Sequence, residues 1–243
     1  MIELKKNLNK LLILLSAILI IQCGKDEDKS LRVVNTYNID IPEPSGLDFS
    51  FDRSGLWTVS DKNDKVYLLD MKGNILNSFE ADGPDIEGIA SINEQTLGLV
   101  TETDREIILV STTGKELRKI DVKSGNGDSG LEGLAYNRNN KEYYVANEKS
   151  PKVIIKLDST LSEINRYDIS FANDLSGLYI DAGYLWVLSD ESRSITKCNL
   201  SCEALESWKI DAESPEGIAV DYENRLVYVV SDPQSRLHVF QLP

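Results

Sequence analysis

The sequence of 243 residues is poor in the groups on which many enzymes depend: it contains one histidine, His238, three cysteines and two methionines. A single histidine argues against a His-ligated transition metal, because such sites draw on several imidazoles or thiolates. There is no G-x-S-x-G nucleophile elbow and no G-x-x-x-x-G-K-S/T phosphate loop. No segment after residue 30 shows sustained helical periodicity, which excludes a helical bundle and favours an all-β chain.

A long hydrophobic run is also missing. The most apolar segment, Leu11–Ile21, is far shorter than the roughly 20 residues that a transmembrane helix needs. It follows three lysines and ends just before Cys23, which is the order of features in an export signal. Cys23 resembles the lipidated cysteine of bacterial lipoproteins, although Gln22 stands where that pattern has a small residue. An uncleaved anchor or an ordinary signal peptide with a chance cysteine is the alternative.

These features divide the chain into three parts. We expect a lipoprotein signal peptide at residues 1–22, a lipidated Cys23 with a short tether at residues 23–30, and one folded domain at residues 31–243. The expected location is the bacterial cell envelope, where acyl chains would hold the protein on the inner or the outer membrane.

Basic residues are scarce. The chain has 26 Lys and Arg against 40 Asp and Glu, a formal net charge of −14. Residues 1–22 hold three of the lysines and one glutamate, so 23 basic and 39 acidic side chains remain without them. Such a surface repels nucleic acid and suits small cations, cationic ligands or basic protein patches. We therefore expect no nucleic-acid partner, and a monomer that binds an unknown small molecule or protein on an acidic face. Plain solubility is the alternative explanation of the charge.

A Gly-hydrophobic motif returns five times along the chain. Its copies are EPSGLDF (43–49), DIEGIAS (85–91), GLEGLAY (130–136), DLSGLYI (174–180) and SPEGIAV (214–220). The third residue of each copy recurs at intervals of 42, 45, 44 and 40 residues. A period of this length, filled with short alternating strands, is typical of four-stranded propeller blades. The glycine of the motif is expected to be scaffold, because a side chain there would crowd the backbone near the axis.

The two ends of the repeat array complement each other. The strands expected in the first unit are Ser45–Phe51, Leu56–Ser60, Val66–Asp70 and Ile75–Glu80. The fifth unit stops at Pro243 without an outer strand, while Leu31–Ile39 precedes the first unit and has no blade of its own. We therefore predict an all-β, five-bladed propeller in which the N-terminal strand closes the last blade and removes the exposed sheet edges.

A second motif brings one carboxylate per unit. An acid stands at the end of each second strand: Asp61, Glu102, Glu148, Asp190 and Asp232. Antiparallel pairing puts this point beside the start of the innermost strand, where three copies of the first motif carry Glu87, Glu132 and Glu216. Eight carboxylates are therefore expected around one mouth of the central channel. His238 falls on the third strand of the last unit, away from this mouth, so no Ser-His-Asp triad is expected there.

Like charges at short range raise each other's pKa unless a cation intervenes. Carboxylates without histidine or cysteine favour Ca²⁺ over zinc or copper. The favoured ligands are Glu87, Glu132 and Glu216, followed by Glu102 and Glu148, with Asp61, Asp190 and Asp232 as further acids of the rim. The alternative is that these acids pair with basic residues of the same loops, namely Lys62, Lys65, Arg105, Lys149, Arg193 and Arg236.

Two cysteines, Cys198 and Cys202, flank an expected hairpin turn in the fourth unit. An exported location permits a disulfide between them, and two free, half-buried thiols are the alternative. A cysteine pair without a nearby histidine is weak evidence for zinc.

With these motifs the chain resembles the SdiA-regulated family of exported bacterial proteins. The resemblance rests on the SGL and EGIA strand starts followed by VSD with a basic residue shortly after, and it covers Ser30–Pro243. It implies a five-bladed propeller, distantly related to NHL-repeat propellers, with a calcium site that falls most naturally on Glu87 and Glu132. Ser45 and Ser176 replace the acid in the first and fourth units. The resemblance implies no particular activity.

Three functions are compatible with this sequence. The favoured one is a membrane-tethered, calcium-binding module for a ligand or protein partner. The second is a hydrolase of lactones or phosphoesters that uses the central ion, and the third is a structural envelope protein whose ion only rigidifies the ring. No pair of carboxylates stands out as catalytic acid and base, so no catalytic residue is assigned. A metal-free carboxylate of raised pKa beside a substrate-sized pocket would favour the hydrolase.

Overall fold

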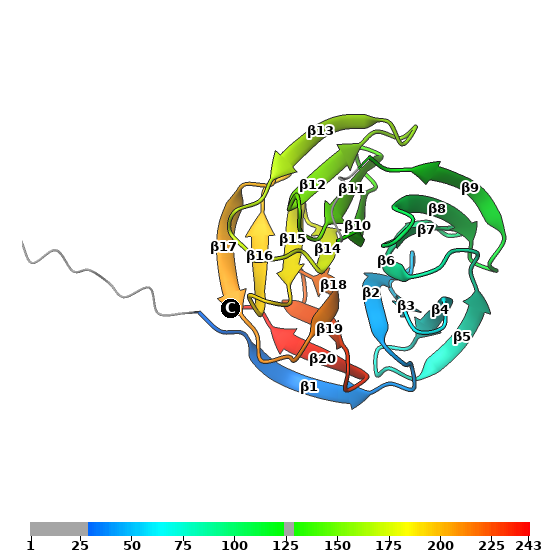
Figure 1. Ribbon diagram of the computed structural model, residues 1–243. Helices are drawn as coiled ribbons and strands as arrows, with labels where there is room; N and C mark the ends of the chain where they lie inside the picture. The colour runs from blue at the N-terminus through cyan, green and yellow to red at the C-terminus, as the bar shows by residue number, and fades with distance from the viewer. Residues whose placement is uncertain (1–28, 124–128) are drawn as a thin grey trace, which may run out of the picture.

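The repeat predicts the architecture correctly. The computed structural model describes residues 29–123 and 129–243, which form five four-stranded antiparallel sheets arranged as blades around a central axis (Figure 1). The described part of the chain is therefore a five-bladed β-propeller. It contains no helix long and apolar enough to cross a bilayer. The expected signal peptide and Cys23 lie outside the described residues.

The blades follow one another along the chain. Blade 1 consists of β2 (Pro44–Phe49), β3 (Leu56–Ser60), β4 (Lys65–Leu69) and β5 (Ile75–Glu80). Blade 2 consists of β6 (Ile86–Asn93), β7 (Thr96–Thr101), β8 (Glu106–Ser111) and β9 (Glu116–Asp121). Blade 3 consists of β10 (Leu131–Asn137), β11 (Glu142–Asn147), β12 (Val153–Leu157) and β13 (Glu163–Asp168). Blade 4 consists of β14 (Gly177–Asp181), β15 (Tyr184–Ser189), β16 (Ser194–Cys198) and β17 (Ala204–Lys209).

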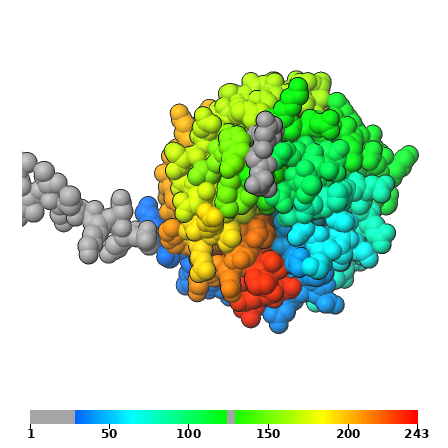
Figure 2. Space-filling view, in the orientation of Figure 1, coloured from blue at the N-terminus to red at the C-terminus, as the bar shows by residue number. Residues whose placement is uncertain are grey.

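Blade 5 is built from both ends of the chain. It orders β18 (Pro215–Asp221), β19 (Leu226–Ser231), β20 (Arg236–Gln241) and then β1 (Arg32–Asn38). In β1, Thr36 lies opposite His238 of β20. On the surface, red atoms of the C-terminal part of the chain lie beside blue atoms of the N-terminal part (Figure 2). The predicted closure is confirmed, and β20 gains a hydrogen-bonded neighbour where it would otherwise be a bare edge.

Each blade runs from a buried inner strand to an exposed outer strand. All six residues of β2 are buried, whereas β5 is exposed at five of its six positions. The inner strands β2, β6, β10, β14 and β18 pack on one another around the axis. Apolar side chains of the middle strands fill the space between blades; Trp186 on β15 is fully buried, and its ring lies 5.9 Å from that of Tyr222 in the next blade. This packing leaves the loops at the two ends of the channel available for function.

The residues just before β1 are tied to the neighbouring blade. The backbone N–H of Leu31 donates to the carbonyl of Lys209 at 2.9 Å, and the N–H of Lys209 donates to the carbonyl of Lys29 at 2.7 Å. Two residues assigned to the tether, Lys29 and Ser30, therefore already lie along the edge of β17 in blade 4.

The two cysteines of blade 4 do not form the disulfide that the sequence permits. Cys198 ends β16 and Cys202 lies in the turn before β17, and both are buried free thiols. They belong to one apolar cluster with Leu185 and Val187. Burial raises the pKa of both thiols to about 12, so they remain protonated and act as small apolar side chains.

Candidate functional site

A cavity of about 200 Å³ lies at the end of the channel where the inner strands begin. Of the eight acids expected at this mouth, seven line the cavity: Asp61, Glu87, Glu132, Glu148, Asp190, Glu216 and Asp232. The eighth, Glu102, has a carboxylate within 4.8 Å of those of Glu132 and Glu148. The structure therefore brings the predicted carboxylates together at one mouth, which we call the acidic mouth.

β-Bulges determine where the three inner glutamates stand. In β6, Ile86 lies opposite Thr101 and Gly88 opposite Val100, so Glu87 has no partner in the ladder. The same irregularity leaves Glu132 unpaired in β10 and Glu216 unpaired in β18. An extra residue of this kind bends the strand and re-aims its side chain. In this propeller the bulges place three glutamates at the acidic mouth.

The glycine of each of these motifs lies close to the backbone of the next blade. A Cβ atom on Gly88 would lie 2.9 Å from the carbonyl oxygen of Glu132, and one on Gly46 would lie 2.7 Å from that of Glu87. Gly46 also has a φ of +48°, a backbone conformation that residues other than glycine rarely adopt. The scaffold role expected for these glycines is supported by this close approach.

Main-chain hydrogen bonds hold the loop acids. The N–H of Glu102 donates to the carbonyl of Asp85 at 2.9 Å, and the N–H of Glu148 donates to that of Gly130 at 3.0 Å. Equivalent bonds join Asp61 to Glu43 at 3.2 Å and Asp232 to Ser214 at 3.1 Å. These bonds use only the backbone, so they fix the loops without occupying the carboxylate oxygens.

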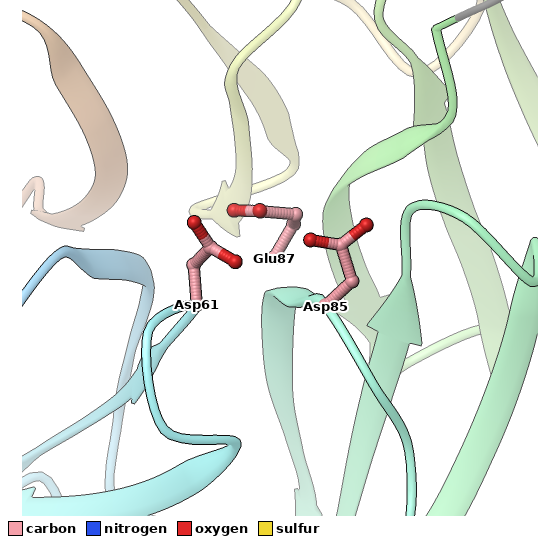
Figure 3. A group of neighbouring side chains, drawn as sticks. All are labelled: Asp61, Asp85 and Glu87. Atoms are coloured by element: carbon pink, nitrogen blue, oxygen red, sulfur yellow. The ribbon is translucent and has the colours of Figure 1, made fainter.

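One group of carboxylates joins blades 1 and 2. Asp61, from the β3–β4 loop, meets Asp85 and Glu87, from the start of β6, with carboxylate oxygens within 4.8 Å of one another (Figure 3). Thr103 Oγ1 donates to Asp85 Oδ2, and Ser45 Oγ donates to the carbonyl of Glu87 at 2.7 Å. The three acids point toward a common space, as they would around a cation.

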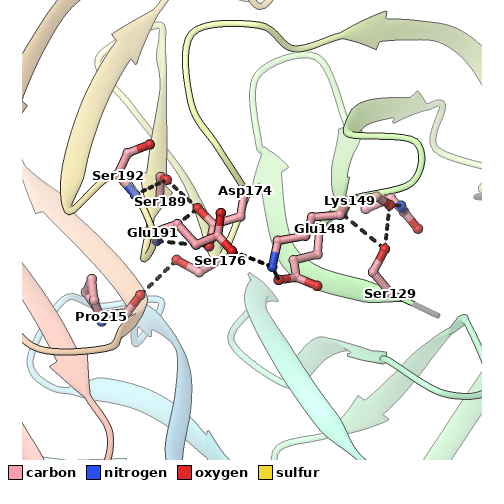
Figure 4. Close-up of polar contacts among 10 residues, drawn as sticks. Ser129, Glu148, Lys149, Asp174, Ser176, Ser189, Glu191, Ser192 and Pro215 are labelled. Atoms are coloured by element: carbon pink, nitrogen blue, oxygen red, sulfur yellow. Dashed lines mark hydrogen bonds and ion pairs between the residues drawn. The ribbon is translucent and has the colours of Figure 1, made fainter. Parts of the chain in front are cut away.

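A second group joins blades 2 and 3. It consists of Glu102, from the β7–β8 loop, with Glu132 and Glu148 of blade 3. Glu148 differs from the others in having a counter-ion: the Nζ atom of Lys149 lies 2.7 Å from its Oε1 and 3.0 Å from Glu191 Oε1 (Figure 4). This group is therefore partly neutralised from within the protein.

The side of the acidic mouth formed by blade 4 is held by hydrogen bonds. Ser189 Oγ donates to Asp174 Oδ1, and the N–H of Glu191 donates to Asp174 Oδ2 at 3.1 Å (Figure 4). Ser176, which stands where other blades carry glutamate, donates from Oγ to the carbonyl of Pro215 at 2.8 Å. Asp174 is thus fully engaged in holding the loop and is a poor candidate ligand.

Burial and mutual repulsion raise the pKa values of the inner acids. Burial raises the pKa of Glu87 to about 8, with Asp61 and Glu216 adding to the shift. Burial also raises the pKa of Glu216 to about 8, and it raises the pKa of Glu132 well above its usual range with help from Glu87 and Glu102. Burial and the adjacent Asp85 raise the pKa of Asp61 to about 6. Each charged form would be stabilised by a cation in the cavity.

The basic residues of these loops neutralise few of the acids. Among the described residues, Lys62 pairs with Glu43 at 2.9 Å, while Lys65 points away to Glu80 at 3.7 Å. Apart from the pair formed by Lys149, no lysine or arginine nitrogen of residues 29–123 and 129–243 comes within 4.0 Å of a carboxylate in either group. Internal ion pairing therefore does not account for the acidic mouth.

Three acids of the acidic mouth were not singled out from the sequence: Glu43, Asp85 and Asp174. All three are the first residue of the Gly-hydrophobic motif, two positions before Ser45, Glu87 and Ser176. Glu43 and Asp85 have φ values of 43° and 63°, which turn the chain into the inner strand. The signal was present, since three of five copies begin with an acid, but the left-handed backbone that turns Glu43 and Asp85 inward is not visible in the sequence.

Fold and site together define a five-bladed propeller whose channel opens onto a cluster of carboxylates. Within that class the particular family is clear. The model of the SdiA-regulated family matches residues 31–241, and the chain belongs to this family. The resemblance of the two repeated motifs is thereby confirmed.

Solved structures of distant sequence share the propeller fold. Glutaminyl cyclase of Myxococcus xanthus has a TM-score of 0.71 at 14% identity, over 88% of this chain and 98% of that one. A streptogramin B lyase has a TM-score of 0.53 at 18% identity, over 86% and 72% of the two chains. A luciferin-regenerating enzyme has a TM-score of 0.54 at 15% identity, over 85% and 94%. At these identities the similarity shows the fold alone.

Proposed function

We propose that the acidic mouth binds Ca²⁺ and that the protein serves as a calcium-dependent binding module in the cell envelope. The supporting observation is the group of Asp61, Asp85 and Glu87, in which three carboxylates face one another without a counter-ion within 4.0 Å among the described residues. The protein tolerates raised pKa values for two of them, and a divalent cation would remove that cost.

The chemistry of the donors favours calcium over other cations. The acidic mouth offers carboxylate oxygens and no imidazole or thiolate, and calcium takes six to eight oxygen ligands in flexible geometry. Zinc and copper prefer nitrogen and sulfur, while magnesium keeps most of its water. The ligands fall into two groups, with Glu87 in one and Glu132, Glu102 and Glu148 in the other. Glu216 lines the cavity outside both.

The partner would bind across the acidic mouth. A cavity of about 200 Å³ has room for an ion, its waters and a small polar group rather than for a large substrate. A ligand or protein that supplies oxygen atoms to an incompletely ligated calcium ion fits this size. In the proposed setting, acylated Cys23 holds the module on the envelope membrane, and replacing Cys23 with serine would release the protein into the soluble fraction.

Calorimetric titration with CaCl₂ after chelation tests the metal site. We expect binding in the micromolar range that is weakened at least tenfold by Glu87→Gln and by Glu132→Gln, because each change removes one charged ligand without altering the size of the side chain. The matched control is Glu223→Gln, which changes an exposed acid of the β18–β19 turn and should leave binding unchanged. Absence of binding heat, or an equal loss in all three variants, would refute the calcium site.

Glu216 favours a second candidate function, a metal-dependent hydrolase. It lines the cavity, belongs to neither carboxylate group, and has a pKa raised to about 8 by burial and by Asp190 and Asp232. An acid outside the two carboxylate groups, with a pKa in this range, is suited to proton transfer near neutral pH. Hydrolysis of a lactone or phosphoester that requires Ca²⁺ and is lost in Glu216→Gln would support this function; inactivity of the wild type on both substrate classes would leave the binding module.

A further inference from the structure

The channel has a second polar pocket at its other end. This pocket, of about 260 Å³, is lined by the far ends of the inner strands and by the turns that follow them. Between the two ends, the channel narrows to a waist of glycine backbone and the side chains of Leu47, Leu134 and Leu178, with no room for a water molecule. The second pocket is therefore separate from the acidic mouth and forms a distinct site.

A buried acid and a buried hydroxyl form the floor of this pocket. Asp48, on β2, is 9% exposed and accepts a hydrogen bond at its Oδ2 from the backbone N–H of Ser91, on β6, at 2.7 Å. Ser91 is 2% exposed, and its Oγ has no hydrogen-bond partner among the described residues. A buried hydroxyl without a partner destabilises the fold, so a ligand that forms a hydrogen bond with it would bind favourably.

Two arginines form the walls, and they are held in different ways. Arg53 is anchored, with ion pairs of 3.8 Å to Asp181 and 3.7 Å to Asp221 and a bond of 3.3 Å to Tyr179 Oη. Arg138, in the turn after β10, has no carboxylate within 4.0 Å among the residues that the structure describes. It donates to the carbonyl of Ser91 at 3.2 Å. Its guanidinium carbon also lies 4.7 Å from the centroid of the Phe51 ring, and its other donors make no hydrogen bond among the described residues.

The arrangement of charges defines the chemistry of a ligand. A planar guanidinium presents paired donors that match a carboxylate. Asp48 lies close enough to Arg138 for the two charges to interact, and burial raises the pKa of Asp48 to about 7. Asp48 already accepts from the Ser91 N–H, and its remaining lone pairs can accept from an amino or hydroxyl group of a ligand. A small ligand can therefore satisfy Arg138 with one end and Asp48 and Ser91 with the other.

We propose that this second pocket binds a small carboxylate carrying an adjacent hydrogen-bond donor, that is, an α-amino or α-hydroxy acid. The carboxylate pairs with Arg138, the donor group reaches Asp48, and the Ser91 hydroxyl gains the partner that it lacks. Arg53 and Tyr179 give the pocket a fixed wall. This site goes beyond the calcium site at the acidic mouth and does not depend on it.

Ligand-observed NMR with four probes tests the proposal: glycine, glycolate, acetate and methylamine, all at equal ionic strength and in the presence of a chelator. We expect glycine or glycolate to bind at least tenfold more tightly than acetate or methylamine, because only they carry both groups. Arg138→Gln should weaken this binding at least tenfold, and Asp48→Asn should reduce the preference over acetate. Arg32→Gln, an exposed arginine on β1, is the matched control and should change nothing.

Three other outcomes would contradict the proposal. Failure of all four probes to bind, equal binding of acetate and glycine, or binding unaffected by both Arg138→Gln and Asp48→Asn would overturn the proposal. A melting curve of each variant separates loss of binding from loss of fold, and Arg138→Lys, which keeps the charge but not the paired donors, should retain only weak binding. Because calcium is chelated throughout, failure here leaves the proposal for the acidic mouth untouched.

Discussion

At the scale of single residues, the acidic mouth is asymmetric. Lys149 lies between Glu148 and Glu191 and neutralises one side, whereas Asp61 and Glu87 face each other with no basic partner within 4.0 Å among the described residues. The raised pKa values on that second side mean that the folded protein holds protons which the unfolded chain would release. The charged forms of these acids therefore destabilise the folded state, and a bound cation would remove this cost.

The first prediction concerns pH. Glu216 has a folded-state pKa of about 8 against an ordinary value of 4.5, so the folded state binds the extra proton in that interval. Its contribution to stability is complete below about pH 4.5 and is lost as the pH rises to about 8, at roughly 1.4 kcal/mol per pKa unit. Melting temperatures measured in chelator should fall across this range, and fall less in Glu216→Gln. Equal slopes for the two proteins would contradict the prediction.

The second prediction concerns Lys149. Lys149→Met removes the cation that lies 2.7 Å from Glu148, so the group of Glu102, Glu132 and Glu148 should bind calcium about tenfold more tightly, equivalent to roughly 1.4 kcal/mol. Titration calorimetry measures the change. Lys62→Met is the control, since its partner Glu43 belongs to neither group, and its effect should be smaller. Weaker calcium binding in Lys149→Met would show that the lysine supports the site.

At the scale of strands, function depends on irregularities in regular sheets. The bulges in β6, β10 and β18 take Glu87, Glu132 and Glu216 out of the ladder and turn them to the acidic mouth. The glycine after each bulge keeps the neighbouring backbones close. Blade 4 has no such bulge at the start of β14 and carries Ser176 instead of glutamate, whereas β2 of blade 1 has a bulge one position later, at Gly46, and carries Ser45.

The third prediction tests this close packing. A Cβ on Gly88 would lie 2.6 Å from Val100 Cγ2 and 2.9 Å from the carbonyl oxygen of Glu132. Gly88→Ala should therefore lower the free energy of unfolding by roughly 2–3 kcal/mol, the upper part of the usual cost of overpacking. Gly183→Ala is the comparison, because Gly183 has a φ of +79° but no atom within 4 Å of the added Cβ, and it should cost about 1 kcal/mol. Denaturant titration measures the free energy of unfolding of both variants. Equal losses in the two variants would mean that crowding at Gly88 contributes little.

The fourth prediction concerns ring closure by β1. Removing residues 1–38 deletes β1 and exposes the edge of β20, which should lower the melting temperature by more than about 10 °C and promote association. A protein that begins at Lys29 keeps β1 and its bonds to Lys209, and should melt as the full chain does. Light scattering and calorimetric melting measure both effects. An unchanged melting temperature without β1 would show that the closure contributes little.

At the scale of the whole molecule, the ring brings side chains from different blades to one axis. Asp61 of blade 1 meets Glu87 of blade 2, and Glu102 of blade 2 meets Glu132 of blade 3. A cation held between blades would link them and resist opening of the ring. The narrow waist divides the channel into an acidic end and an arginine-containing end, so the two proposed ligands would bind in separate pockets.

The fifth prediction follows from this linkage. Calcium at 100 times its dissociation constant should stabilise the folded ring by about 2.7 kcal/mol and raise the melting temperature by roughly 5–10 °C, and chelation should reverse the effect. Magnesium at the same concentration should give a smaller rise, because it requires strict octahedral geometry and gives up its water reluctantly. Thermal melting with each ion tests this. An equal rise with both ions, or with sodium at matched ionic strength, would indicate charge screening alone.

The sequence by itself determined the number of blades, their strands and the end of the channel at which the acids gather. It could do so because a propeller is a local repeat: Leu56–Ser60 and Ile75–Glu80 are strands within the bounds that their alternation predicts, and Leu31–Ile39 was the one strand left to close the ring. Family membership followed from the same motifs, and the match over residues 31–241 confirms it.

Only the tertiary structure decided which acids form groups and which cysteines stay free. Asp85 joins Asp61 and Glu87 because the bulge in β6 and the left-handed backbone of Asp85 aim both side chains across a blade boundary. The opposite pocket depends on the ring in the same way, since Asp48 and Arg138 come from strands and turns two blades apart. The spacing of residues in the sequence predicts contacts within a blade. Contacts between blades depend on how the sheets pack around the axis, which the spacing does not specify.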